Sequence, residues 1–487
     1  MRARKTIRLA NSEVSRLELG FLSEWGIFVQ KASKTFHSEA NKTFDRDNEI
    51  VVVEFSVGNF RSISAEQTLS FEAANGESLS DMLITDPSRP DDPLLPSLFL
   101  FGGNASGKTN ICKAIQAVRD LTMFSATMLN RGQAIPQIEP NRLVANLADQ
   151  PSSFGIKLLL NGELWDYRIQ VDSTSVRNES LHRKANSPKA RWSEVFTRTN
   201  GDKSSWVGNA PRLNRTFFES VRENCSVLSK AAAEDIAAVL PVYDYISNIR
   251  IRNLANPPLD VVEKAIESSE NDPALFQALA RIVACADIQV NEIQIDEKEL
   301  AVDEVPDWLR AFSAYATENE PSPKISAHKL KFLINRDDGA EVGFELQDLS
   351  DGTVRFLALV INILQALKDG SLLVMDEFDA SLHTLLALAV RDLLTDSDLN
   401  KNGAQFIAVT HSDALLDSSR LRRDQIVAIN RLDGIGTTWW ALSELDRKPK
   451  KDESFQRRYL NGGYGGVPRI ADLRAHVLAA LRGAGGT

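Results

Sequence analysis

One eight-residue segment restricts the fold of this chain more than any other feature. Residues 102–109 read Gly-Gly-Asn-Ala-Ser-Gly-Lys-Thr and fit the pattern G-x-x-x-x-G-K-[ST]. The short apolar run 98–101 before it predicts a buried parallel strand, and the apolar face of 110–128 after it predicts a helix. In this setting the pattern predicts a loop that binds phosphate through its backbone N–H groups and the helix N-terminus. A chance match in a glycine-rich turn is the alternative.

The residue types of this loop suit a nucleoside triphosphate bound with Mg²⁺. Glycines let the backbone curl so that its N–H groups face the phosphates. Lys108 can reach the β- and γ-phosphates, and the Thr109 hydroxyl can ligate Mg²⁺. The predicted nucleotide-binding residues of the loop are Gly102, Gly103, Asn104, Ala105, Ser106, Gly107, Lys108 and Thr109.

A second segment supplies the acidic groups that such a site requires. Residues 372–375 are apolar and lead directly into Asp376 and Glu377. A buried strand that ends in an acid is how phosphate-loop proteins hold the second contact to Mg²⁺, so Asp376 is the candidate metal ligand with Thr109. Glu377 is placed to polarise an attacking water as a general base. Two solvated acids at a strand end are the alternative interpretation.

Two histidines follow apolar or acidic segments of the same half of the chain. The strand expected at 405–409 leads to His411, which we predict to contact the γ-phosphate and to be catalytic together with Glu377. His383, four residues after Asp379, has either a similar role or is a solvated residue at a helix start.

A Ser-Asp-Gly segment precedes the helix expected at 354–368. Ser350 and Gly352 predict a second anion site at a helix N-terminus, lying 26 residues before Asp376. A plain serine or aspartate helix cap is the alternative.

The remaining pattern predicts a split α/β core with a mixed segment between its halves. The Asn161-Gly162 pair is a strong hairpin signal, 173–210 looks irregular, and 212–285 looks helical, broken at 256–258. Further strands are expected at 50–57, 67–73, 154–160, 164–171, 288–295, 329–335 and 341–346, and a further helix at 381–394.

Composition excludes several classes of protein. With 43% hydrophobic and 25% charged residues among 487, the chain is typical of a globular protein and not of a disordered, fibrous or membrane protein. A net charge of −10 excludes a strongly basic nucleic-acid coat. Cys112, Cys225 and Cys285 lie too far apart for a disulfide framework or a zinc site and suit the cytoplasm. No window approaches a membrane span of about 20 apolar residues.

Together these segments resemble the ABC-type ATPase heads of the SMC, recombination-repair and overcoming-lysogenization-defect proteins. The matching pieces are Walker A at 102–109, an LSxG-type signature at 349–352, Walker B at 372–377, a D-loop at 379–383 and the switch His411. More narrowly, the chain is similar to AAA-family ATPases of bacterial anti-phage defence and abortive-infection operons. The residues that carry this narrower resemblance are Asn59-Phe-Arg-Ser, Arg355 after the signature, Ser381-Leu-His383 and the tail 459–468.

The resemblance implies an α/β fold, namely a P-loop NTPase of the ABC/SMC-head type with a split core and a mixed, mainly helical insertion. It implies ATP and Mg²⁺ as cofactors, ATP hydrolysis, and a homodimer or higher oligomer with ATP sandwiched between heads. In that arrangement Ser350 and Gly352 act in trans. A glutamine of the Q-loop type is not evident; Gln137 is a guess. The expected domains are an N-terminal extension 1–49, ATPase lobe I 50–129, a β-hairpin and helical insertion 130–325, lobe II 326–446 and a tail 447–487.

Three functions fit these features. The first is an ATP-driven switch or sensor of a defence system that acts with a separate effector. The second is an ATPase-controlled DNA-binding or nuclease-associated protein of the repair type; basic clusters at 183–191, 250–252, 422–423 and 447–451 leave DNA open as a partner, although each is also a candidate solvated face. The third is a scaffold that hydrolyses ATP poorly. A built-in nuclease is disfavoured because no D-x-D follows His411. Residues 1–49 are expected to be a loosely docked extension, a partner-binding arm or the product of a misassigned start codon.

Overall fold

The structure is a computed structural model of the chain. It describes residues 50–86, 91–185, 187, 189–199, 203–254, 273–286, 290–299, 326–447, 449, 453–467 and 473–483. The expectation for 1–49, the helix break at 256–258 and the end of the tail motif at Pro468 lie outside the described residues.

The chain divides into two compact units. Unit 1 includes Arg252–Asp369 and Ala380–Leu386, and unit 2 includes Glu49–Ile251, Gly370–Asp379 and Ala387–Thr487. The predicted phosphate loop, Asp376, Glu377 and His411 therefore belong to unit 2. The Ser350–Gly352 segment and His383 belong to unit 1.

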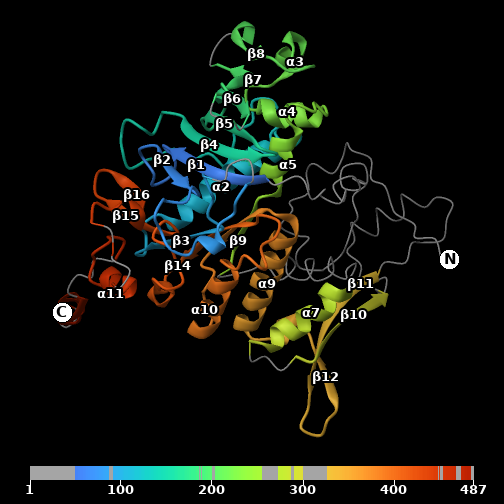
Figure 1. The fold of residues 1–487 in the computed structure, drawn as a ribbon, viewed down its shortest axis with the longest axis vertical. Helices are drawn as coiled ribbons and strands as arrows, with labels where there is room; N and C mark the ends of the chain where they lie inside the picture. Colours follow the sequence, from blue (N-terminus) through green and yellow to red (C-terminus); the bar gives the residue numbers. More distant parts are fainter. Residues whose placement is uncertain are drawn as a thin grey trace, which may run out of the picture. The chain divides into compact units, whose positions relative to one another are not determined.

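A six-stranded sheet forms the centre of unit 2 (Figure 1). Its order is β16 (Gly436–Ala441), β15 (Ile426–Leu432), β3 (Ser97–Gly102), β14 (Gln405–Thr410), β13 (Leu372–Asp376) and β9 (Arg250–Asn253). The four strands from β15 to β13 are parallel, whereas β16 pairs antiparallel with β15. All residues of β3, β13 and β14 are buried, which explains their continuous apolar sequences.

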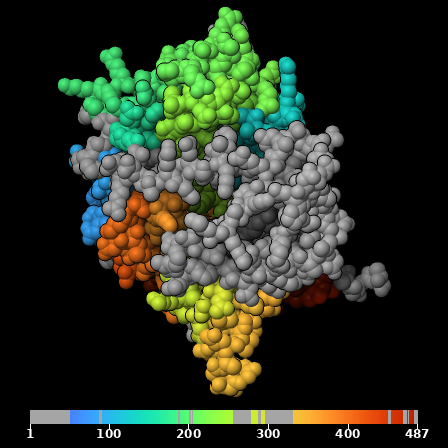
Figure 2. Space-filling view, turned by 90° about the vertical axis from the view of Figure 1, so that its right-hand side faces the viewer, coloured from blue at the N-terminus to red at the C-terminus, as the bar shows by residue number. Residues whose placement is uncertain are grey.

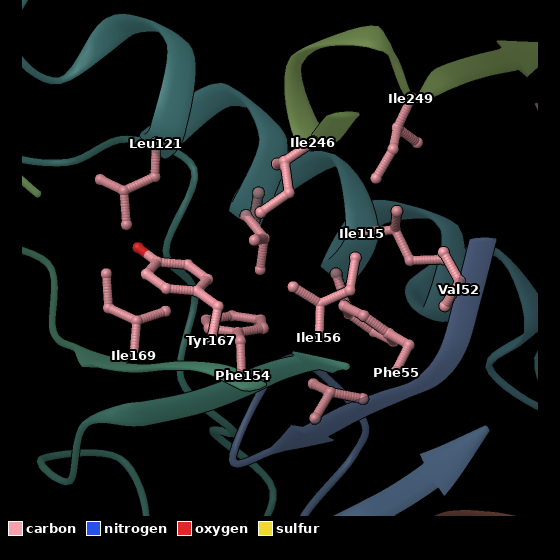
Figure 3. Packing of buried hydrophobic residues seen from close by; sticks show 14 of the residues in the cluster. Val52, Phe55, Ile115, Leu121, Phe154, Ile156, Tyr167, Ile169, Ile246 and Ile249 are labelled. Atoms are coloured by element: carbon pink, nitrogen blue, oxygen red, sulfur yellow. The ribbon is translucent and has the colours of Figure 1, made fainter. Parts of the chain in front are cut away.

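A second, seven-stranded antiparallel sheet adjoins this core through helix α2 (Lys108–Phe124). Side chains of three of its strands point toward α2 and α5 (Leu240–Asn248), as Figure 3 shows. The opposite side of α2 contacts β3 and β13, so the helix packs between the two sheets. The sheet order is β2 (Gln67–Ser70), β1 (Ile50–Gly58), β4 (Ser152–Leu160), β5 (Glu163–Val171), β6 (Val176–Ala185), β7 (Ser193–Arg198) and β8 (Val207–Gly208).

The expectation that 173–210 is irregular was wrong. This segment contains β6, β7 and β8, which continue the sheet beyond the predicted Asn161-Gly162 hairpin. The alternation of β6 is weak because the charged Glu179 is buried beside Val176 and Leu181, and because the pairing register of the strand shifts twice. Helices α3 (Arg215–Ser220) and α4 (Val227–Ala233) pack beside them, and the group forms one green mass in Figure 2.

Unit 1 has a small sheet and two helices among its described residues. Strands β10 (Glu292–Glu299), β11 (Ser326–Asn335) and β12 (Glu341–Phe344) are antiparallel, and α7 (Pro273–Ala284) contacts β10 and α9 (Asp351–Asp369). The other α-helices in the described part of the chain are α10 (Thr384–Leu393), α11 (Phe455–Leu460) and α12 (Leu473–Gly483). None of the helices in the described ranges is long and apolar enough to cross a bilayer.

Candidate functional site

Three adjacent parallel strands of unit 2 end at one edge of the six-stranded sheet, and each contributes a predicted site residue. Strand β3 runs into the phosphate loop, β14 into His411, and β13 into Asp376 and Glu377. The register pairs Phe101 with Thr410 and Met375 with Ala408, so the strand ends lie side by side. The carboxyl ends of parallel strands are where α/β proteins bind ligands. Sequence segments about 300 residues apart are thereby brought together.

The phosphate loop curls tightly before helix α2. Ala105 and Gly107 have φ angles of 60° and 106°, and Gly107 is the N-cap of the helix. A Cβ on Gly107 would lie 2.1 Å from the Oγ1 of Thr437, so this position requires glycine for space as well as for its backbone conformation. Lys108 is 5% exposed, and its Nζ donates to the carbonyl oxygens of Gly102 at 2.5 Å and Gly103 at 3.0 Å.

A layer of hydroxyl groups supports the loop from behind. Thr437 of β16 donates from Oγ1 to the Ser106 carbonyl at 2.8 Å, and its Oγ1 lies 2.7 Å from the Oγ of Ser62. Asn110 of α2 donates to the same Ser62 oxygen at 2.6 Å. Sequence reasoning placed Ser62 in a family motif but missed Thr437, because a single threonine in an edge strand carries no motif.

The neighbouring Arg61 links the loop helix to the segment that contains Gln137. Its Nε donates to Asn110 Oδ1 at 2.9 Å, and its guanidinium pairs with Glu139. Gln137 is half-buried in a turn two residues before Glu139. The guessed Q-loop residue thus lies in a segment that is tied to the start of α2 through Arg61.

Asp376 and Ser106 each have a buried polar side-chain atom at the candidate site. Asp376 is 4% exposed and accepts a hydrogen bond from the Thr109 hydroxyl. Its Oδ1 and the Oγ of Ser106 are buried without a hydrogen-bond partner among the described residues. Such groups are costly unless a ligand satisfies them. The Thr109 hydroxyl beside the Asp376 carboxylate is a set of ligands that suits Mg²⁺. This ion takes one or two protein ligands and completes its coordination shell with phosphate and water.

Glu377 has an unusual backbone conformation. It directly follows β13, is half-buried and has φ of 54°, in the left-handed region. For a residue other than glycine this conformation costs on the order of 1–2 kcal/mol. Strain of this kind gathers at functional sites, where the surrounding structure enforces it. Here the amide of the next residue, Phe378, donates to Val409 O at 3.2 Å and fixes the turn against β14.

The charges of the site influence one another. Burial lowers the pKa of Lys108 to about 8, although Asp376, Glu377 and Asp379 act in the opposite direction. Burial, and next the charge of Glu377, raises the pKa of Asp376. Burial and the nearby Lys108 cation lower the pKa of His411, which favours a neutral imidazole at pH 7.

Asp379 joins the acidic strand end to the histidine strand. The Thr410 hydroxyl donates to the Asp379 carboxylate at 2.8 Å. The oxygen of this hydroxyl also accepts a hydrogen bond from the Ser412 amide at 2.9 Å. Burial raises the pKa of Asp379. The residues on both sides of His411 are therefore fixed, while the imidazole itself is exposed.

The signature segment is a separate structure in unit 1. Ser350 caps α9, since its Oγ accepts from the Thr353 amide at 3.2 Å and lies 2.7 Å from the Thr353 hydroxyl. Arg355 bonds to the Ser381 hydroxyl, and a Cβ on Gly352 would lie 3.3 Å from Ser381 O. His383 is exposed, and its Nδ1 accepts from the Leu385 amide at 3.2 Å at the start of α10. Ser350 thus makes the contact that its helix-cap alternative describes, and His383 is an exposed residue at a helix start.

Comparison with known families identifies a matching family model. Residues 97–417 match the family described as "AAA domain, putative AbiEii toxin, Type IV TA system". This range includes the phosphate loop, Asp376, Glu377 and His411. A search of curated proteins finds no match.

Comparison with solved structures finds the recombination mediator protein RecF. The structure titled "Structure of the recombination mediator protein RecF-ATP in RecFOR pathway" is 14% identical, with a TM-score of 0.32, and covers 81% of this chain and 100% of that chain. A second, of RecF-ATPrS, is 13% identical, with a TM-score of 0.29, and covers 75% of this chain and 93% of that chain.

Proposed function

The chain belongs to this AAA-domain family, and from that premise we propose that it binds and hydrolyses ATP with Mg²⁺ as a switch or sensor in bacterial anti-phage defence. One observation carries the ATPase part of the proposal. Three neighbouring strand ends bring Lys108, His411, and the pair Asp376 and Glu377 to one edge, where two buried polar atoms have no partner among the described residues. A nucleotide with its metal ion would satisfy them.

Each residue has a distinct role in this proposal. The loop amides of 102–109 and the Lys108 ammonium bind the β- and γ-phosphates. Thr109 and Asp376 hold Mg²⁺, which neutralises phosphate charge when bound. Glu377 accepts a proton from the attacking water, and His411, neutral at pH 7, donates a hydrogen bond toward the γ-phosphate. Ser350 and Gly352 contribute from a second copy of the chain, in a homodimer or higher homo-oligomer.

The defence part of the proposal rests on the family description, which names an abortive-infection toxin and a toxin–antitoxin system. We assign the chain the ATP-dependent role and place the damaging activity in a separate effector. No group of three potential ligands among the described histidines, cysteines and acids could hold a metal ion. The cytoplasm is the proposed location, and the five domains with boundaries at 49/50, 129/130, 325/326 and 446/447 remain part of the proposal.

The ATPase proposal is tested with purified protein and the variant Lys108→Ala. Loss of the main side-chain cation should abolish ATP binding and hydrolysis. Lys113→Ala is the matched control, because Lys113 is exposed on the same helix. Hydrolysis by Lys108→Ala at the wild-type rate would show that the phosphate-loop assignment is wrong.

The defence proposal is tested in cells. The gene with its neighbours should lower phage plaque formation, and Lys108→Ala should remove that protection while Lys113→Ala retains it. The neighbouring genes should include a nuclease or another toxic effector, whose deletion also removes protection. Protection that persists with Lys108→Ala would exclude an ATP-dependent role in it.

A DNA-binding role is the second candidate, and the tip of the β6–β7 hairpin favours it. Arg183, Lys189, Arg191 and Trp192 are exposed there, and Trp192 is 44% exposed. Cations beside an exposed aromatic ring suit a nucleic-acid backbone and its bases. By contrast, Arg422 of another basic cluster is buried and paired with Asp424 at 2.7 Å.

DNA binding is measured by fluorescence anisotropy over a range of salt concentrations. Arg191→Glu and Trp192→Ala should each weaken binding, and Arg215→Glu on exposed helix α3 is the control. Equal DNA affinity of all these variants would remove the hairpin as the DNA site.

A further inference from the structure

The C-terminal segment 454–466 supplies no group to the phosphate loop or to the acidic strand end, yet it lies against both sides of the candidate site. It consists of helix α11 and a glycine-rich turn, and it belongs to unit 2. The sequence marks it only as a point of family resemblance and assigns it no role. Its contacts indicate one.

The first set of contacts reaches the beginning of the phosphate loop. Tyr459 is 8% exposed, and its ring meets Phe101 of β3 edge-on with 6.0 Å between centroids. The Tyr459 hydroxyl donates to Gly466 O at 3.0 Å. Gly466 has φ of 70°, and a Cβ there would lie 3.5 Å from the Cα of Gly102. The turn therefore passes beside the first residue of the phosphate loop, and the positive φ of Gly466 favours glycine at this point.

The second set of contacts reaches the residues after His411. Helix α11 packs against the short helix η5 (Asp413–Leu415), which begins two residues beyond His411. Gln456 Nε2 donates to Asp413 Oδ2 at 2.9 Å. Burial, and next the charge of Asp413, raises the pKa of the Tyr459 hydroxyl to about 12, so it remains a donor at physiological pH.

We infer that segment 454–466 is a positioning element of the nucleotide site. Gly466 fixes the start of the phosphate loop, α11 fixes the turn after His411, and Tyr459 joins the two. Phosphate binding and the approach of His411 then depend on one rigid connection. This inference rests on the proposed function, in that it assigns a role in binding and hydrolysis of ATP.

A pair of Tyr→Phe variants tests the phosphate-loop contact. Tyr459→Phe removes the hydrogen bond to Gly466 and keeps the ring against Phe101. Tyr464→Phe is the matched control, because Tyr464 is 2% exposed in the same segment and its hydroxyl bonds to no described residue. We expect Tyr459→Phe to raise the KM for ATP by about threefold to tenfold, the usual effect of one lost hydrogen bond. The kcat should change little, since the loop binds phosphate equally in the ground and transition states.

A second pair tests the contact near His411. Gln456→Ala removes the bond to Asp413, and Arg457→Ala changes the next exposed residue of the same helix. Because His411 acts on the transition state, Gln456→Ala should lower kcat by about twofold to fivefold and leave the KM unchanged. Arg457→Ala should leave both constants at the wild-type values.

A readout without turnover separates this inference from the proposed function. Amide hydrogen exchange of residues 103–107 should be faster in Tyr459→Phe than in Tyr464→Phe, with both variants at the wild-type melting temperature. If wild-type protein hydrolyses no ATP, the proposed function fails, and the exchange rates still decide the inference. If Tyr459→Phe and Tyr464→Phe match in both exchange and KM, the positioning role is wrong.

Discussion

The two helices that begin at predicted anion sites, α2 in unit 2 and α9 in unit 1, differ in how their N-termini are satisfied. At α2 the N-cap is Gly107, which has no side chain to bond the first amides, and the adjacent groups are buried and charged. At α9 the side chain of Ser350 already accepts from the Thr353 amide, and Ser350 is exposed. The first N-terminus has no side-chain cap, whereas at the second one amide is already bonded by Ser350. A phosphate is therefore expected to bind first at α2 and to meet α9 later, in the assembled oligomer.

The largest effect is expected from a variant of Glu377, which tests whether the acidic strand end beside α2 takes part in ATP hydrolysis. Glu377→Gln removes the general base but keeps the shape of the side chain. We expect ATP to bind and hydrolysis to slow by about 10²-fold or more, the usual contribution of a positioned base. The variant should also accumulate as an ATP-dependent dimer by light scattering, because the sandwich does not open without hydrolysis.

The control for the trapped dimer is Glu377→Gln combined with Lys108→Ala, which should remain monomeric in ATP. A Glu377→Gln protein that stays monomeric in ATP would contradict the sandwich. Hydrolysis at the wild-type rate by Glu377→Gln would instead show that Glu377 is not the general base. The site at α2 would then be supported only as a nucleotide-binding site.

The next effect tests whether α9 acts in trans. Ser350→Arg should leave ATP binding by the monomer intact, because the phosphate loop of the same chain is unchanged. Hydrolysis should fall by at least about tenfold, since a bulky cation blocks the N–H groups of α9 from the γ-phosphate. Ser350→Ala removes the cap without blocking the helix start. It should lower stability by about 1 kcal/mol and retain most of the activity.

Mixing Ser350→Arg with Lys108→Ala sharpens this test. A mixed dimer has one site with both lesions and one with neither, so partial activity should return. No recovery at any mixing ratio, from folded and dimerising variants, would mean that Ser350 acts in cis or that the two sites fire together. Lost ATP binding by Ser350→Arg alone would identify the cis arrangement.

The same contrast explains what the sequence could reveal. The glycine-rich turn before α2, the buried strands β3 and β13 and the acid at the end of β13 were predictable, because close backbone approach and continuous burial restrict each position to few residue types. Strands β6 to β8 were missed because the buried charge of Glu179, the register shifts and the two-residue length of β8 interrupt the apolar alternation. Thr437 was missed, and the turn at Gly466 was marked only as part of a family motif, for a different reason. Each supports the loop through tertiary contacts from a segment that is distant in the sequence, and no local pattern reveals such a role.

A smaller effect concerns the charge at α2. The pKa of Lys108 is lowered to about 8 in the free protein, and bound phosphate would raise it by favouring the ammonium form. ATP affinity should therefore be complete below pH 8 and fall by up to about tenfold per pH unit above it, until the pKa of the complex is reached. Calorimetric titration from pH 7 to 9.5 measures this slope.

The control is Lys108→Arg, whose ATP affinity should not change over this pH range, because arginine stays protonated. If the ATP affinity of both proteins falls equally with pH, another group is responsible for the titration.

The smallest expected effect concerns the layer of hydroxyl groups that supports the start of α2. Thr437→Val keeps the volume of the side chain and removes the bonds from its Oγ1 to the Ser106 carbonyl and Ser62. We expect the KM for ATP to rise by about threefold to tenfold, because the loop is then held less firmly.

Thr438→Val is the control, since the buried Thr438 hydroxyl has no partner in the described part of the chain. Thr437→Ser should restore the wild-type KM, because serine replaces the lost hydroxyl. Equal KM values for Thr437→Val and Thr438→Val would show that the phosphate loop keeps its shape without the hydroxyl layer, and that Gly107 and Lys108 suffice to make the N-terminus of α2 differ from that of α9.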